Sequence, residues 1–353
     1  MRQAATALLL IAWLTSAAVA DPAPQGPRDS SPHDHDGATR APNRSTPWID
    51  QAPTKLFEST TEQRSDHRLA AALTLGGFYV GFVTWSYFAW YRHADSQDFK
   101  WGGDGNWRLW QDSGWFGPKT YAGGADKLGH AWATYGLARG GTELLHQWGG
   151  YNKLTSSLIA AGLSEALFFG VEIKDGYHYE FSFGDLSFNT SGALLAVAMS
   201  NWPRLDELID YRVEYWPSHA YVRQFEGGNV NIAEDYSGQT YLLAMHLGGI
   251  HSLRDSKYGS WSRFVDVVGG YETRGYKPDP PESDTADYKY TQRAYFGLSL
   301  NAQGLCDWLF EERSKPAKKI THGVFEVFNA PFGSFGIVDG QRSPDGKPMG
   351  GGA

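Results

Sequence analysis

Four long apolar stretches dominate the first part of the chain, and each is long enough to form a helix. They cover residues 69–91, 125–146, 154–173 and 185–202. The first holds no charged residue over 23 positions. As a helix it would be about 35 Å long, enough to cross a hydrocarbon core of about 30 Å. Aromatic side chains crowd its second half, which is typical of a membrane surface. We expect a helical, membrane-like core over residues 56–204. For the first stretch, the alternative is a fully buried core helix of a soluble protein.

Beyond residue 205 the pattern changes to one that is typical of strands. Segments 236–250, 262–276 and 290–300 are rich in aromatic and β-branched residues with partial alternation, and residues 277–289 read as a turn-forming loop. These strands are too few for a closed transmembrane barrel, which needs at least eight. The expected fold class is therefore α+β, with four apolar helices followed by a small, mostly antiparallel β region over residues 205–342.

The two ends of the chain have a different character. Residues 1–20 read as a secretory signal peptide, because Arg2 precedes an apolar stretch that ends in Ala18-Val19-Ala20. Residues 21–55 are rich in Pro, Asp, Ser and Arg and predict a disordered linker, and residues 343–353 predict a disordered tail. The mature protein is therefore expected to be exported.

Overall composition narrows the classes of partner. The net charge of -8 and the pI near 5.8 argue against binding to nucleic acid and against electrostatic attraction to anionic lipid. The mean hydropathy of -0.43 is low for a protein made mostly of membrane spans, so only the helical section is expected to be membrane-like. The single cysteine, Cys306, excludes an intrachain disulfide framework.

Polar side chains interrupt three of the apolar segments in pairs that share a helix face. The pairs are Asp126 with His130, Glu172 with Asp175, and Asp185 with Asn189. If the helices pack side by side, these groups would converge in one pocket. Ionisable groups inside an apolar bundle are costly, and they persist when they are paired or have a function.

The order of these residues resembles a known family. The pattern DKxxH, then ExxD, then DxxxNxxG is similar to the predicted periplasmic lipoproteins of the YfiM type and, more loosely, to the VanZ-like membrane proteins. The matching positions are Asp126, Lys127, His130, Glu172, Asp175, Asp185, Asn189 and Gly192. The resemblance covers roughly residues 120–202 and implies a periplasm-facing protein of the bacterial cell envelope, but no settled activity. A lipoprotein needs a cysteine directly after its signal peptide; the only one here is Cys306, so lipid anchoring is not expected.

Three physical accounts of the polar residues compete. In the first they form a structural network that fixes the register of the helices. In the second, His130, Glu172 and Asp185 bind a divalent metal such as Zn, Mn or Mg, the only cofactor that the sequence indicates. In the third, general acid–base chemistry acts on a lipid head group. The catalytic candidates would then be His130, Asp126 and Glu172, and the binding candidates Lys127, Asp175, Asp185 and Asn189.

Common catalytic motifs are missing, since the chain contains no GxSxG, P-loop, HExxH or CxxC pattern. We therefore expect an uncharacterised exported, membrane-associated envelope protein that binds a lipid or envelope component through a buried polar pocket. Two alternatives remain open: a metal-dependent lipid-modifying hydrolase or transferase that uses the same residues, and a structural envelope scaffold. Whether the protein is an enzyme, and which membrane it contacts, stay undecided at this point.

Overall fold

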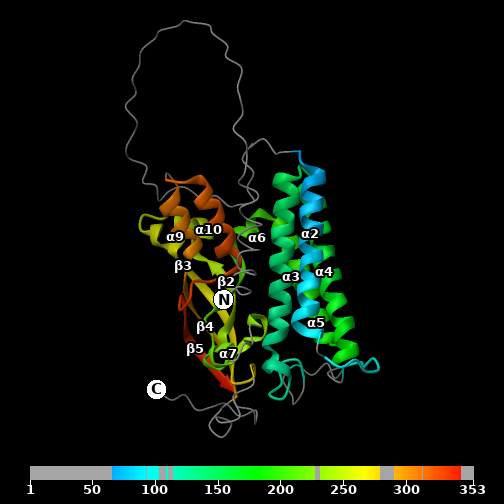
Figure 1. Ribbon diagram of the computed structural model, residues 1–353. Coiled ribbons are helices and arrows are strands. Elements are labelled where there is room, and N and C mark those ends of the chain that lie inside the picture. The colour runs from blue at the N-terminus through cyan, green and yellow to red at the C-terminus, as the bar shows by residue number, and fades with distance from the viewer. Residues whose placement is uncertain are drawn as a thin grey trace, which may run out of the picture.

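The computed structural model describes residues 66–92, 94–102, 109, 114–226, 231–278, 290–311 and 313–342. Four helices stand side by side, and a five-stranded sheet lies next to them with two further helices at one end (Figure 1). In chain order the helices and strands are α2 (Arg68–Ser86), α3 (Ala125–Glu143), α4 (Lys153–His178), α5 (Phe183–Asn201), α6 (Pro203–Leu208), β1 (Ile209–Tyr215), α7 (His219–Glu226), β2 (Gln239–His246), α8 (His251–Arg254), β3 (Val265–Arg274), β4 (Thr291–Leu300), α9 (Ala302–Phe310), α10 (Lys315–Val327) and β5 (Ser334–Arg342). The predicted signal peptide, the predicted linker and the predicted tail lie outside the described residues, as does all but the start of the predicted loop over residues 277–289.

The four predicted helices are present as α2 to α5, and this part of the α+β prediction is confirmed. Among the described residues, only two helical segments are long and apolar enough to cross a membrane: α2 with the π-helical turn that continues it to Tyr91, and α4. The expectation of four membrane-like helices is therefore wrong for α3 and α5. The reason is their position: α3 packs against α4, α5 and the sheet, so its surface is covered by protein and tolerates polar side chains.

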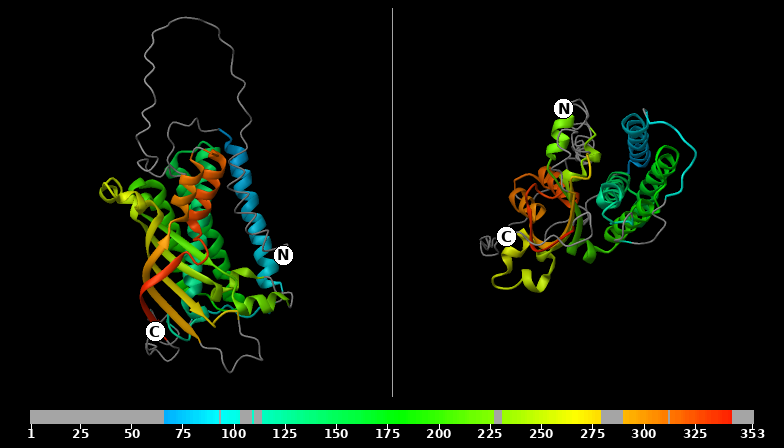
Figure 2. Two further views of the ribbon diagram at one scale, coloured as in Figure 1. Left: turned by 90° about the vertical axis from the view of Figure 1, so that its left-hand side faces the viewer. Right: turned by 90° about the horizontal axis from the view of Figure 1, so that it is seen from below.

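The sheet is antiparallel throughout, in the order β1-β2-β3-β4-β5, which confirms the expected pairing. It curls on itself, as the end-on view shows (Figure 2). At one end its two edge strands meet, because Glu214 in β1 accepts hydrogen bonds from the backbone N–H and the hydroxyl of Ser334 in β5. The sheet therefore has an inner face and an outer face, and α9 and α10 lie at its end (Figures 1 and 2).

Parts of the carboxyl-terminal region differ from the expectation. Strands β1 and β5 and helices α9 and α10 were not predicted, and the interval expected to be only strands and loops contains both helices. Cys306 lies in α9 rather than in a strand. Strand β1 was missed because its polar residues Asp210, Arg212 and Glu214 look like solvated residues in the sequence. In the structure they point to the inner face of the sheet.

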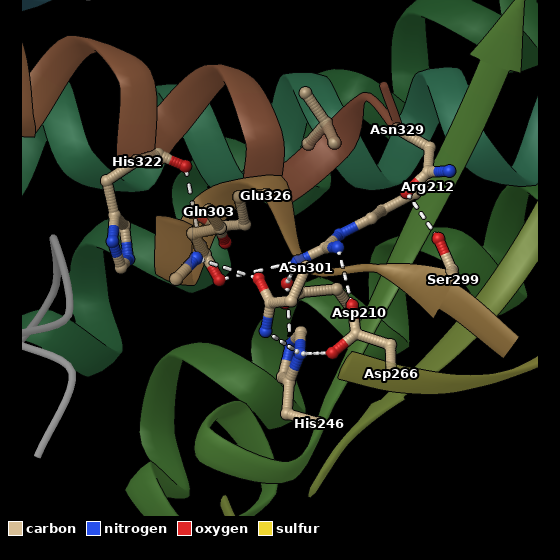
Figure 3. Close-up of polar contacts among 12 residues, drawn as sticks. Asp210, Arg212, His246, Asp266, Ser299, Asn301, Gln303, His322, Glu326 and Asn329 are labelled. Atoms are coloured by element: carbon tan, nitrogen blue, oxygen red, sulfur yellow. Dashed lines mark hydrogen bonds and ion pairs between the residues drawn. The ribbon is translucent and has the colours of Figure 1, made fainter. Parts of the chain in front are cut away.

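Four side chains on the inner face form a closed ring of alternating charge (Figure 3). Arg212 donates to Asp210 at 2.6 Å and to Asp266 at 2.9 Å. The two ring nitrogens of His246 lie 2.8 Å from the same two carboxylates. Burial lowers the pKa of His246, but the two carboxylates outweigh it and raise the pKa to about 9. At neutral pH two cations therefore face two anions in the interior.

The ring predicts an asymmetric response to two arginine substitutions. Arg212→Met leaves two buried carboxylates with one cation, so we expect the free energy of unfolding in detergent to fall by about 3–5 kcal/mol. Arg204→Met removes an exposed pair with Glu207 and should cost less than about 1 kcal/mol. Chemical denaturation of both variants measures the difference, and equal losses would contradict a stabilising ring.

The same ring predicts a pH dependence. The folded pKa of His246 lies near 9, above its ordinary value of 6.5, so its contribution to stability is complete below about pH 6.5 and is lost as the pH rises through 9. The free energy of unfolding should therefore decline between pH 7 and pH 10, and His246→Gln should flatten this decline. An identical slope in the variant would show that other groups titrate there.

Candidate functional site

Helices α3, α4 and α5 pack as an antiparallel group, and glycines set how closely they approach. A Cβ on Gly192 in α5 would overlap the carbonyl oxygen of Ala131 in α3, so only glycine allows this crossing. A Cβ on Gly184 would lie 2.6 Å from Cε of Lys127, so this glycine makes room for the lysine stem. Gly192 is the last residue of the DxxxNxxG pattern, and its role is therefore one of packing.

The first turns of helices α3 and α5 position the side chains of Asp126 and Asp185. Ser182 is the N-cap of α5 and accepts a hydrogen bond from the backbone N–H of Asp185, at 3.1 Å. Because Ser182 caps the helix, the Asp185 carboxylate can face α3. Helix α3 begins after Gly124, whose φ of 86° is left-handed, and Asp126 lies in its first turn, where a negative charge is favoured by the helix dipole.

Three of the predicted site residues converge at one point. Ligating atoms of His130, Glu172 and Asp185, one from each of α3, α4 and α5, all lie within 4.8 Å of one another. Nδ1 of His130 is 3.5 Å from Oε1 of Glu172 and 3.1 Å from Oδ1 of Asn189. Thr134 donates to the same Asn189 oxygen at 3.1 Å. The imidazole is 17% exposed, so the group is reachable from outside although both carboxylates are buried.

Lys127 lies between two of the acids. Its ammonium is 3.5 Å from Asp126 and 3.3 Å from Asp185, and the whole lysine is buried. Burial and the nearby Asp185 carboxylate raise the pKa of Asp126 to about 7. Burial also raises the pKa of Asp185, but the nearby Lys127 and His130 outweigh this effect and hold the pKa of Asp185 below its ordinary value. Asp185 is therefore the ionised partner of the lysine.

The remaining predicted residue, Asp175, is held at the edge of this group. It accepts a hydrogen bond from Tyr91 at 2.8 Å and is not one of the three converging ligands. Sequence reasoning missed three supporting residues: Tyr91, Thr134 and Ser182. Two of them had a detectable signal, since Thr134 follows His130 by one helical turn and Ser182 precedes Asp185 by the spacing of a helix cap.

Three buried oxygens of the group accept no hydrogen bond from the described residues. They are Oδ1 of Asp126, Oε1 of Glu172, which lies 3.5 Å from His130, and Oδ1 of Asp185, which lies 3.3 Å from Lys127. The other oxygen of Glu172 accepts from the backbone N–H of Ser182 at 3.3 Å. Buried acceptors without a hydrogen bond cost about 1–3 kcal/mol each, so such atoms need an explanation.

Comparison with known families gives one match. Residues 112–201 match the family described as predicted periplasmic lipoprotein (DUF2279), whose function is unknown. The segment contains every residue of the pattern from Asp126 to Gly192, so the expected likeness to predicted periplasmic lipoproteins is confirmed for this part of the chain. The narrower likeness to YfiM and VanZ stays a prediction. No curated protein and no solved structure matches the chain.

The close crossing of α3 and α5 predicts opposite effects for two glycine substitutions. Gly192→Ala inserts a methyl group against the backbone of α3 and should lower the free energy of unfolding by about 1–3 kcal/mol. Gly162→Ala in α4 meets no atom within 4 Å, so it should leave stability unchanged or raise it by up to about 1 kcal/mol. Denaturation in detergent compares them; a harmless Gly192→Ala would contradict the tight crossing.

Proposed function

We propose that this chain is a membrane-embedded envelope protein that holds a divalent cation on His130, Glu172 and Asp185 and thereby binds a phosphate-bearing lipid or envelope component. The observation that carries the proposal is the convergence of one imidazole and two carboxylates from three different helices. The sequence alone gave the same three ligands as a metal hypothesis, and their separation of at most 4.8 Å supports it.

The outer surfaces of α2 and α4 support a membrane location. Only Ala71, Leu75 and Ser86 of α2 are buried, and large apolar side chains cover the exposed surface of both helices. The exposed apolar residues are Leu69, Leu73, Val80, Val83, Phe88, Leu154, Leu158, Ile159, Leu163, Phe169 and Ile173. The segments of 24 and 26 residues would be about 36–39 Å long, which matches a bilayer.

The cation-binding group lies near one end of the bundle. Asp126 and Asp185 are in the first turns of α3 and α5, and Glu172 is about 9 Å from the end of α4 at His178. If α2 and α4 cross a bilayer, this end is at the level of the lipid head groups. A phosphate group at that level could reach the site from the side of His130, whose imidazole is partly exposed.

The donor set and the charge balance fit a divalent cation. One imidazole and two carboxylates are common ligands of Zn and Mn. A bound cation would place positive charge between the Glu172 and Asp185 carboxylates. Asn189 and the Ser182 N–H hold His130 and Glu172 in place. Once bound, the cation would supply positive charge that attracts phosphate oxygens.

The metal content of purified protein tests the proposal. After loading with Zn²⁺ or Mn²⁺ and removal of free metal, elemental analysis should find about one ion per chain in the wild type. Glu172→Gln should lose the ion, and bound metal should no longer raise its melting temperature. Glu165→Gln, on the same helix but hydrogen-bonded to Thr190 outside the group, is the matched control and should retain both effects.

Co-purifying phospholipid, measured by mass spectrometry, tests the ligand separately. It should fall in Glu172→Gln and persist in Glu165→Gln. Near-zero metal in the loaded wild type would overturn the cation site, and equal phospholipid in both variants would overturn the phosphate-bearing ligand.

A further inference from the structure

The inner face of the curled sheet combines an apolar cluster of Leu242, Ala244, Val268 and Tyr295 with a buried ring of charged side chains. A sheet with one solvated face normally buries its apolar side chains and exposes its polar ones. Here the inner face buries the Asp210, Arg212, His246 and Asp266 ring, with Arg212 fully buried. The outer face exposes large apolar side chains instead.

The exposed apolar side chains form one continuous patch on β2, β4 and β5. Register places Leu243, Phe296 and Val338 in one row across the sheet, and Met245, Leu298 and Phe335 in the next. Phe296 is 55% and Val338 66% exposed, so neighbouring elements do not cover them. We call these six residues, with Leu300, the outer patch.

The remaining part of the outer face is covered by the helical bundle. Tyr211, Tyr241 and Tyr271, on the same face, are buried against α3 as part of the main core. The outer face is thus apolar along its whole width, and its uncovered part faces away from the bundle (Figure 1). An apolar outward face is the pattern of strands that contact lipid.

We propose that the outer patch contacts the acyl chains of one membrane leaflet. The sheet packs against α3, and α2 and α4, whose outer surfaces are apolar, lie on the other side of the bundle, so one bilayer can touch both sides of the molecule (Figures 1 and 2). From Phe296 to Leu300 the patch extends about 14 Å along β4, about half of a hydrocarbon core of about 30 Å.

At the end of the sheet that carries Leu300, the two edge strands meet. Unpaired strand edges are not tolerated in hydrocarbon. At the end of the sheet that carries Leu300, the edge of β1 is covered, because the N–H of Asn329 donates to the carbonyl of Val213 at 2.8 Å. Ser334, at the start of β5, bonds to Glu214 in β1. The two edges therefore meet beside the patch.

Fluorescence quenching in reconstituted vesicles tests this contact. In a Cys306→Ser background, single cysteines replace Phe296, Val338, Leu73 on α2 and the exposed Ser256, and each is labelled with an environment-sensitive fluorophore. The full chain is placed in phosphatidylethanolamine and phosphatidylglycerol vesicles with or without nitroxide-bearing lipid. Labels at Phe296→Cys and Val338→Cys should lose fluorescence well beyond Ser256→Cys and be shielded from iodide.

Two results would overturn the proposal. Labels at Phe296→Cys and Val338→Cys could respond to iodide like Ser256→Cys, which would make the patch water-exposed. They could also be shielded from both quenchers while a disulfide joins Phe296→Cys in two copies, which would make the patch a dimer contact. Leu73→Cys reports the placement of α2, and metal content reports the cation site, so failure of the proposed function is distinguishable from failure here.

Discussion

Charges in a medium of low polarity must be compensated by other groups of the fold, and this constraint governs where the elements of this protein meet. Arg139 in α3 donates to Glu326 in α10 at 2.6 Å, to Asp206 in α6 at 2.5 Å and to Ser200 in α5 at 3.1 Å. One buried guanidinium thus joins the helical bundle to the carboxyl-terminal region. The Arg212 and His246 ring does the same within the sheet by connecting β1, β2 and β3. These polar contacts act together with the apolar core that α3, α5 and the sheet share.

This interior explains the low mean hydropathy of a chain with membrane-like surfaces. The buried residues include many charged and polar groups, whereas the exposed ones include large aliphatic and aromatic side chains on α2, α4 and β5. The mean hydropathy averages the buried polar residues with the exposed apolar ones, so it understates how apolar the surface is. Only the fold shows that many polar residues are buried and many apolar residues are exposed.

The sequence predicted what is encoded locally and missed what depends on distant partners. Asp126 with His130, and Asp185 with Asn189, are one helical turn apart, so helix periodicity alone placed them on shared faces. Strand β1 was missed because Asp210 and Arg212 look like solvated residues until Asp266 and His246 are brought next to them. Helices α9 and α10 were missed for a related reason: their polar inward residues, such as Asp307, His322 and Glu326, are paired only in three dimensions.

The buried polar group in the helical bundle differs from the charged ring in the sheet. This difference bears on whether the group in the bundle has only a structural role. In the sheet, each carboxylate of the ring accepts from both an arginine and a histidine, and the charges balance. In the bundle, Glu172 and Asp126 each keep an oxygen without a hydrogen bond from the described residues, and the acids outnumber the lysine. The ring in the sheet thus balances its charges, although Nε of Arg212 forms no hydrogen bond with the described residues. The proposed cation site therefore rests on the partly exposed imidazole of His130 and on its convergence with Glu172 and Asp185 within 4.8 Å.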